Sequence, residues 1–274
     1  MRRYSVCFLL LCICGGARAA SYDDFSRGLA ANNRGEYDLA ISALTSALGA
    51  GDLNASLIPV AYLDRGIAHR HKGECKDAVS DLSAAIKLKP DYVDAYWERA
   101  VANSCAGDWS AALADLDTLI ARRPGKSAYR SRGMLHWENG DFAAAAADFQ
   151  QAAALDPKDA YVALWLELSR MRAGTLDPAQ VSGDIRHIDS DWPMPVLDLY
   201  RGKITADEAV KAASKGDAAT LTGRQCEADF YVAEWWMAGR NESTAKPLLE
   251  RAKAECPRGF EEYPAAVTEL NRLQ

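Results

Sequence analysis

The hydrophobic pattern of residues 20–159 returns about every 34 residues. Each period holds two apolar segments of helical length with a glycine between them, and the last three periods end on Pro90, Pro124 and Pro157. A glycine at this point ends a first helix, and a proline cannot continue a second one. The pattern therefore predicts pairs of antiparallel helices, one pair for each period.

Two sets of positions explain why the helices should pair. Counted from the start of each unit, small residues recur at positions 8 and 20, where they let two helices approach closely: Gly28, Ala40, Gly66, Ala78, Ala100, Ala112, Gly133 and Ala145. A bulky apolar residue at position 24 is expected to fill the space between the two helices: Leu44, Leu82, Leu116 and Phe149.

These fixed offsets resemble the tetratricopeptide repeat, a unit of two antiparallel helices that stacks into a solenoid. The resemblance implies an all-α fold with four tandem units in residues 20–159. We expect a degenerate repeat and inserted helices in residues 160–225, where prolines and glycines disturb the pattern. The stretch "CEADFYVAEWWMAGR" restores the register, so residues 226–274 are predicted to form a C-terminal unit and a closing helix.

Position 7 of all four tandem units is an arginine, and position 23 of the last three is an aspartate: Arg27, Arg65, Arg99 and Arg132, with Asp81, Asp115 and Asp148. We interpret these residues as ion pairs within or between repeats, because arginines with available carboxylates usually pair locally. A row of ligand-binding arginines is the alternative. At position 11, His69 and His136 are expected to be packing residues.

The start of the chain has the pattern of a secretory signal peptide, which we assign to residues 1–19. A basic start is followed by an apolar stretch at residues 4–14 and by a small-x-small cleavage site ending at Ala19. We expect cleavage there and export of a soluble protein to the periplasm. No stretch of the sequence is long and apolar enough to span a membrane.

A lipoprotein anchor is the alternative to a soluble exported protein. Lipidation needs a small residue just before the modified cysteine, but Leu11 precedes Cys12 and Ile13 precedes Cys14. The sequence therefore favours the ordinary cleavage.

Four cysteines remain after the expected cleavage, and an even number in an oxidising compartment indicates disulfides. In the repeat geometry, Cys75 and Cys105 lie side by side at facing helix ends, as do Cys226 and Cys256. We predict the bridges Cys75–Cys105 and Cys226–Cys256. Four free buried thiols are the alternative.

Composition and motifs bound the chemistry. Loss of residues 1–19 leaves 29 lysines and arginines against 38 acidic residues, a formal charge of −9 in place of −6. An acidic chain does not offer the positive surface that nucleic acid needs. The sequence has no metal-ligand spacing, phosphate-binding glycine loop or nucleophile motif, so we predict no catalytic residue, metal or cofactor.

The first helices of such a solenoid line its concave surface. At the positions concerned, most side chains are apolar: Tyr22, Phe25, Leu29, Leu63, Ile67, Trp97, Val101, Met134 and Trp137. Arg70 and Arg130 lie at the margins. This is more apolar surface than a solvated groove normally exposes, so we predict a groove that binds an apolar peptide or protein segment. Coverage of this face by neighbouring helices or by a dimer partner is the alternative.

The order of the elements also resembles the NlpI-type family of bacterial periplasmic tetratricopeptide lipoproteins. Four tandem repeats are followed by "LWLEL", by an excursion with "LYRGKIT", and by a last repeat that begins with "CEADFYVAEWWMAG". The resemblance implies a homodimeric periplasmic adaptor that brings a protease together with peptidoglycan hydrolases. The chain departs from that family in its unsuitable lipidation cysteines.

The sequence thus predicts a non-enzymatic, exported scaffold for protein interactions. An assembly or chaperone factor for another envelope complex is the second hypothesis, and an enzyme of unrecognised type is the third.

Overall fold

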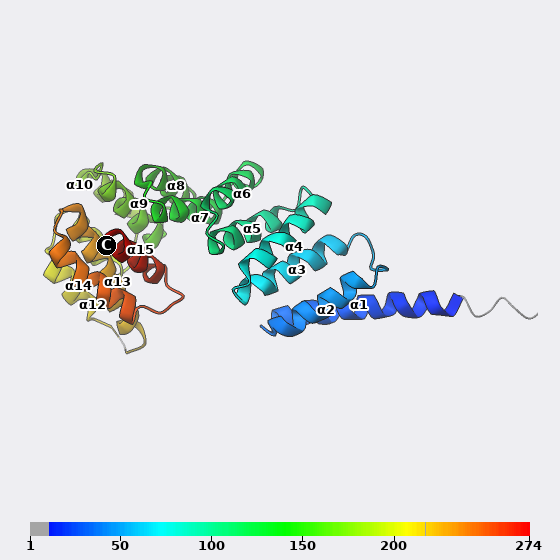
Figure 1. Cartoon of the computed structure of the whole chain (residues 1–274). Helices are drawn as coiled ribbons and strands as arrows, with labels where there is room; N and C mark the ends of the chain where they lie inside the picture. Colours follow the sequence, from blue (N-terminus) through cyan, green and yellow to red (C-terminus); the bar gives the residue numbers. More distant parts are fainter. Residues whose placement is uncertain (1–10, 217) are drawn as a thin grey trace, which may run out of the picture. The chain divides into compact units, whose positions relative to one another are not determined.

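The computed structural model describes residues 11–216 and 218–274, and within these ranges the chain forms helices and no strand (Figure 1). The predicted all-α repeat fold is confirmed. The chain divides into two compact units, residues 1–123 and 124–274, each of which we describe by itself. None of the described helices is long and apolar enough to cross a membrane.

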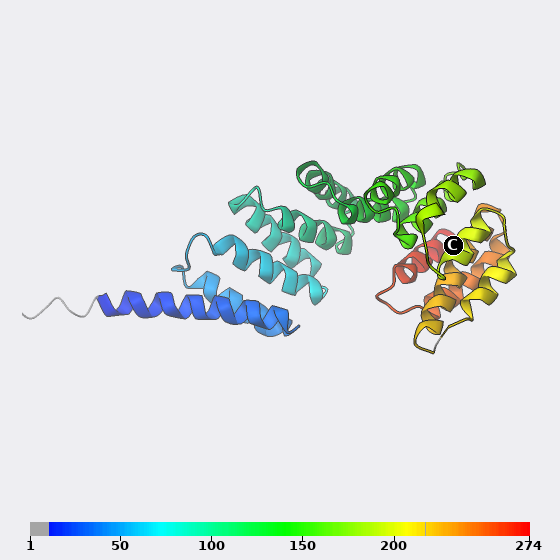
Figure 2. The same cartoon turned by 180° about the vertical axis from the view of Figure 1, so that it is seen from behind.

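Unit 1 consists of three antiparallel helix pairs, one for each of the first three repeats (Figures 1 and 2). The pairs are α1 (Leu11–Asn33) with α2 (Tyr37–Gly49), α3 (Ile58–His71) with α4 (Cys75–Leu88), and α5 (Val93–Cys105) with α6 (Trp109–Arg122). The predicted signal peptide falls partly on residues 1–10, which lie outside the described residues. The expected cleavage point after Ala19 falls within α1.

Close approach within each pair depends on the small residue at position 8. A Cβ atom added to Gly28 would lie 2.5 Å from Cγ of Leu44, and one added to Gly66 would lie 2.8 Å from Cγ of Leu82. At such distances the leucine side chain or the helix would have to shift, so glycine favours close approach in these two repeats. The turns between helices use glycines with positive φ, such as Gly73 at 77°.

Unit 2 begins with the fourth helix pair and ends with the C-terminal helices. Its elements are α7 (Lys126–Glu138), α8 (Phe142–Leu155), α9 (Ala160–Arg172), α10 (Pro178–Asp184), the 3₁₀ turn η1 (Ile185–His187), α11 (Met194–Tyr200), α12 (Ala206–Ala213), α13 (Ala218–Ala238), α14 (Glu242–Glu255) and α15 (Glu262–Arg272). Helix α13 carries the sequence that restores the repeat register, and it begins eight residues earlier than that sequence because no proline interrupts it.

Aromatic side chains fill the core of unit 2. The ring centroid of Trp165 lies 5.2 Å from that of Trp137, 5.8 Å from that of Phe230 and 6.1 Å from that of Phe149. All four side chains are fully buried. These contacts join α7, α8, α9 and α13, so the C-terminal repeat that begins in α13 packs directly onto the fourth repeat.

Candidate peptide-binding face

The arginine at position 7 pairs with the aspartate at position 23 of its own repeat. Nε and Nη2 of Arg65 donate to the two carboxylate oxygens of Asp81 at 2.8 and 2.7 Å, and the same geometry recurs from Arg99 to Asp115 and from Arg132 to Asp148. The predicted ion pairs within repeats are confirmed. Two carboxylate bonds occupy each of these guanidinium groups, which argues against a row of ligand-binding arginines.

The arginines of unit 1 also connect successive repeats. Nη1 of Arg65 donates to the Thr45 hydroxyl at 3.0 Å, and Nη1 of Arg99 donates to the Ser83 hydroxyl at 3.0 Å. Each hydroxyl belongs to the second helix of the preceding repeat. One side chain therefore joins three helices.

Position 11 supplies a further polar neighbour for each aspartate. Asn103 Nδ2 donates to Asp115 at 3.1 Å, while Nε2 of His69 lies 3.8 Å from Asp81. His136 lies at 3.9 Å from Asp148 in the same way. These histidines are half-buried between the helices, as expected of packing residues, but they also face a carboxylate, which the sequence argument did not anticipate.

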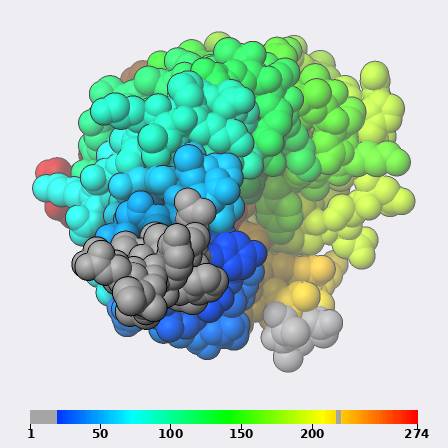
Figure 3. Space-filling model, turned by 90° about the vertical axis from the view of Figure 1, so that its right-hand side faces the viewer, coloured from blue at the N-terminus to red at the C-terminus, as the bar shows by residue number. Residues whose placement is uncertain are grey.

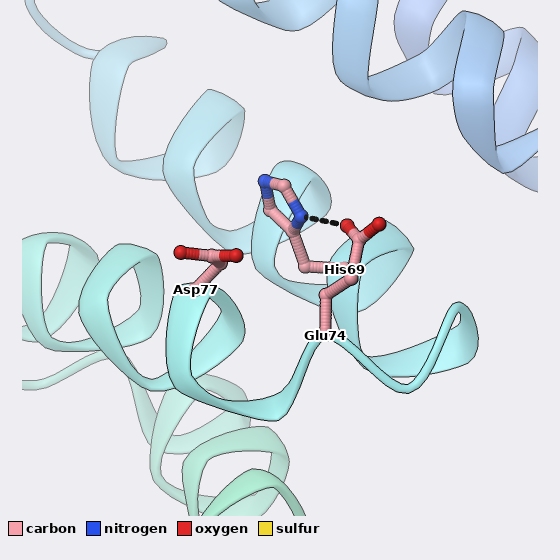
Figure 4. Close-up of side chains that lie close together, drawn as sticks. All are labelled: His69, Glu74 and Asp77. Atoms are coloured by element: carbon pink, nitrogen blue, oxygen red, sulfur yellow. Dashed lines mark hydrogen bonds and ion pairs between the residues drawn. The ribbon is translucent and has the colours of Figure 1, made fainter.

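His69 is also part of a small polar group at the turn between α3 and α4 (Figure 4). His69, Glu74 and Asp77 place potential metal-ligand atoms within 4.8 Å of one another. However, Nδ1 of His69 is hydrogen-bonded to Glu74 at 2.6 Å, and the Lys72 ammonium lies 2.8 Å from the same carboxylate. These local contacts account for the group, and we assign no metal to it.

In unit 1, the predicted groove residues divide into buried and accessible side chains. Phe25 and Leu63 are buried in the core, whereas Tyr22, in the middle of α1, is exposed. The remaining four form what we call the inner stripe: Leu29, Ile67, Trp97 and Val101. The first three are half-buried and Val101 is 37% exposed, so the stripe offers apolar surface on α1, α3 and α5.

Polar residues beside the inner stripe are paired between successive repeats. Asn32 Nδ2 donates to the Asp64 carbonyl at 2.7 Å, and Arg70 Nε donates to Glu98 at 2.9 Å. Burial raises the pKa of Asp64 above its ordinary value. Arg70, expected at the groove margin, is therefore already engaged by a carboxylate of the next repeat, and the stripe is the part of this face left for apolar contacts.

In unit 2, the corresponding face is covered by the C-terminal segment. The Arg130 guanidinium lies 2.6 Å from Glu261, and Nη2 of Arg272 donates to the carbonyls of Trp137 and Glu138 at 3.0 and 2.6 Å. Trp137 is fully buried. The prediction that Trp137 lines an accessible groove is wrong, because its ring packs against Trp165 and Phe230 and the Arg272 guanidinium lies over it.

Met134 is half-buried against the core of unit 2. Of the predicted apolar residues on α7, Met134 alone keeps partial exposure, whereas unit 1 has the four residues of the inner stripe. For α7, the structure therefore agrees with the alternative expectation that neighbouring helices cover the apolar face.

Buried charged residues hold the C-terminal helix in place. Nη1 of Arg172 contacts Glu234 and donates to Glu269 at 2.8 Å, and both carboxylates are fully buried. Arg272 forms a further ion pair with Glu269. Burial is the main cause that raises the pKa of Glu234, to about 8. This network joins α9, α13 and α15.

A second buried carboxylate lies between α9, α13 and the segment before α11. Glu227 accepts hydrogen bonds from Nε1 of Trp192 at 2.6 Å and from the Tyr161 hydroxyl at 3.0 Å. Burial raises the pKa of Glu227 to about 7. Tyr231 makes a similar bond to Glu262 at 2.6 Å. These contacts fix helices to one another, and each carboxylate already has a protein donor.

The structure contains both expected disulfides, Cys75–Cys105 in unit 1 and Cys226–Cys256 in unit 2. The Cα atoms are 5.8 and 5.0 Å apart. The first bridge joins the start of α4 to the end of α5, and the second joins α13 to the end of α14. These four cysteines are therefore structural in this fold.

Stacked helix pairs with an apolar inner stripe define a helical-repeat protein of the kind that binds other proteins. Residues 63–103 and 106–160 match the family described as Tetratricopeptide repeat. The chain therefore contains tetratricopeptide repeats in this region, as the sequence pattern predicts. Such repeats generally mediate interactions between proteins.

Solved structures show the same fold at low sequence identity. A tetratricopeptide repeat protein from Parabacteroides merdae is 16% identical, with 92% of this chain and 100% of that chain covered and a TM-score of 0.61. The C-terminal part of a repeat protein from Cytophaga hutchinsonii is 16% identical, with coverage of 92% and 91% and a TM-score of 0.54. A MamA protein is 20% identical, with coverage of 61% and 91% and a TM-score of 0.54.

Proposed function

We propose that the protein is an exported adaptor without catalytic activity of its own, which binds an apolar segment of a partner protein on the inner stripe. The observation that carries this proposal is the row of accessible apolar side chains on three successive first helices, ending in Val101. The charged residues beside the row are paired with one another. The row therefore favours apolar contacts and offers few free charges to a ligand.

The C-terminal helix of the chain indicates what such a face can hold. In unit 2, α15 has Ala265 and Ala266 fully buried, and it is tied to α7 by the Arg130–Glu261 ion pair and by two hydrogen bonds from Arg272. The fourth repeat thus already binds a helix. A partner helix with small and apolar residues on one side is the occupant that we propose for the inner stripe.

The disulfides support export, because such bonds persist in oxidising compartments. Together with the signal-peptide pattern, they favour the periplasm. The NlpI-type order of elements suggests a specific partner class, a periplasmic protease and peptidoglycan hydrolases, and a homodimeric state. We include these in the proposal as consequences of the resemblance. The apolar stripe alone is equally suited to an assembly factor for another envelope complex.

Cross-linking in the periplasm followed by affinity capture tests the proposal. Wild type is expected to retain a protease or a wall hydrolase, and Trp97→Ala is expected to lose it without unfolding. If wild type captures envelope-assembly components instead, the protein is an assembly factor and the proposed protease and hydrolase partners are wrong. Hydrolysis of wall fragments by the purified protein would contradict the non-enzymatic role.

A further inference from the structure

The loop between α2 and α3 contains a carboxylate, Asp52, with no hydrogen-bond donor among the described residues. Both carboxylate oxygens of Asp52 are buried, and no described residue donates a hydrogen bond to either one. Buried carboxylate oxygens are unfavourable unless they accept hydrogen bonds. The loop belongs to "GAGDLNAS", which makes the first repeat four residues longer than the pattern requires. Asp52 therefore belongs to the inserted residues, and its lack of a hydrogen-bond donor needs an explanation.

Asp52 lies beside the beginning of the first repeat. It lines a recess together with Ser21 and Tyr22 of α1 and with Leu53 and Asn54 of its own loop. In the space-filling view of Figure 3, the first coloured residues of the chain, drawn dark blue, lie against lighter blue residues of unit 1. A donor for Asp52 can therefore come from the backbone at residues 20–22.

The repeat register gives residue 20 a special place. The first helices α3, α5 and α7 begin at Ile58, Val93 and Lys126, seven or eight residues before the small residue at position 8. The same spacing before Gly28 falls at Ala20 and Ser21, but α1 begins at Leu11. Cleavage after Ala19 would make the first helix begin where the other first helices begin.

We propose that Asp52 binds the N-terminus that this cleavage creates. A signal peptidase hydrolyses the Ala19–Ala20 peptide bond with one water molecule, which leaves a carboxylate on Ala19 and an ammonium group on Ala20. In the uncut helix, the N–H groups of residues 20–23 donate to carbonyls four residues earlier. Removal of those carbonyls frees the N–H groups of the first turn. The ammonium and the freed N–H groups then supply the donors that Asp52 lacks.

Helix physics favours this pairing. A carboxylate at a helix N-terminus accepts hydrogen bonds from the first-turn N–H groups and interacts favourably with the helix dipole. A full positive charge on Ala20 adds an ion pair. The inference rests on the export included in the proposed function and not on partner binding, so the Asp52 pairing and the partner-binding stripe can fail separately.

Two purified chains test the pairing, one that begins at Ala20 and one that keeps residues 15–19. In the chain that begins at Ala20, NMR titration should give the Ala20 ammonium a pKa above the ordinary value of about 8. Asp52→Asn should return that pKa to the ordinary value. It should also lower the melting temperature by about 2–4 °C in this chain and by much less in the longer one.

Asp91→Asn is the matched control, because Asp91 lies exposed in the loop between α4 and α5. It should leave both the ammonium pKa and the melting temperature unchanged. An ordinary ammonium pKa in wild type would overturn the proposal even if the Asp52 variant did not fold. Equal effects of Asp52→Asn in the two chains would overturn it as well, as would an exported protein whose intact mass shows a first residue other than Ala20.

Discussion

The guanidinium of Arg99 donates to both carboxylate oxygens of Asp115, at 2.9 and 2.6 Å, across the two helices of one repeat. The partners are sixteen residues apart, and Arg65 and Arg132 each reach an aspartate at the same separation. A sequence repeat has thus become a repeat of contacts. The paired aspartates are almost fully buried, so the ion pairs belong to the packed interface between the helices and not to the solvent-exposed surface.

Removal of Asp115 should therefore be costly. Asp115→Ala leaves the donors of Arg99 and Asn103 without their acceptor, and we expect a loss of about 2–3 kcal/mol in the free energy of unfolding. Denaturant titration measures it. The control is Asp24→Ala, which breaks the more exposed Arg27–Asp24 pair and should cost at most about 0.5 kcal/mol. Equal losses at the two sites would contradict the structural role of the buried pairs.

The disulfides should contribute strongly to stability. Each bridge closes a separation of 30 residues, which corresponds to about 3–4 kcal/mol in the chain-entropy model. The double variant Cys226→Ser, Cys256→Ser should lose roughly this amount. Intact mass of the unfolded protein should rise by four hydrogen atoms on reduction, two for each bridge. An unchanged mass would show that the cysteines are free.

The stability of unit 2 should depend on pH through Glu227. Its pKa lies at about 7 in the folded protein and near 4.5 in the unfolded chain, because burial disfavours the charge. Because the folded state favours the protonated form, the contribution of Glu227 to stability is complete below pH 4.5 and is lost as the pH rises to about 7. At about 1.4 kcal/mol per pKa unit, the decrease is about 3 kcal/mol.

Glu227→Gln isolates this contribution from those of the other buried carboxylates. Relative to wild type, the variant should gain stability between pH 4.5 and pH 7, and the gain should level off above pH 7. Denaturant titrations at several pH values measure the difference. A constant difference across the range would mean that Glu227 is not buried as a neutral acid.

The helix pairs could be predicted because their determinants are local. Glycine opposite leucine, as in Gly28 and Leu44, and arginine sixteen residues before aspartate are visible in one period of the sequence. The covering of α7 could not be predicted, because Arg272 reaches the Trp137 carbonyl from 135 residues away in the chain. From its place at position 12 of the repeat, Trp137 was expected on an accessible face. The inner stripe was predictable in composition, but its restriction to unit 1 required the position of α15.

Arg272 should anchor α15. Arg272→Ala removes two hydrogen bonds to α7 and one ion pair, so we expect a loss of about 2–3 kcal/mol and faster amide hydrogen exchange in residues 262–272. Lys253→Ala, an exposed change on α14, is the control and should alter neither quantity. Unchanged exchange in the Arg272 variant would contradict the assignment of α15 as a fixed cover.

The central claim is that the inner stripe binds a partner, and site-specific photo-cross-linking in the periplasm tests it most directly. A photoreactive residue at Val101 is compared with one at Leu88, which is 54% exposed on the second helix α4. Both positions are accessible, so neither change should unfold the protein. The account predicts a discrete cross-linked partner from position 101 and none from position 88. Equal labelling from both positions, or a partner from position 88 alone, would contradict it.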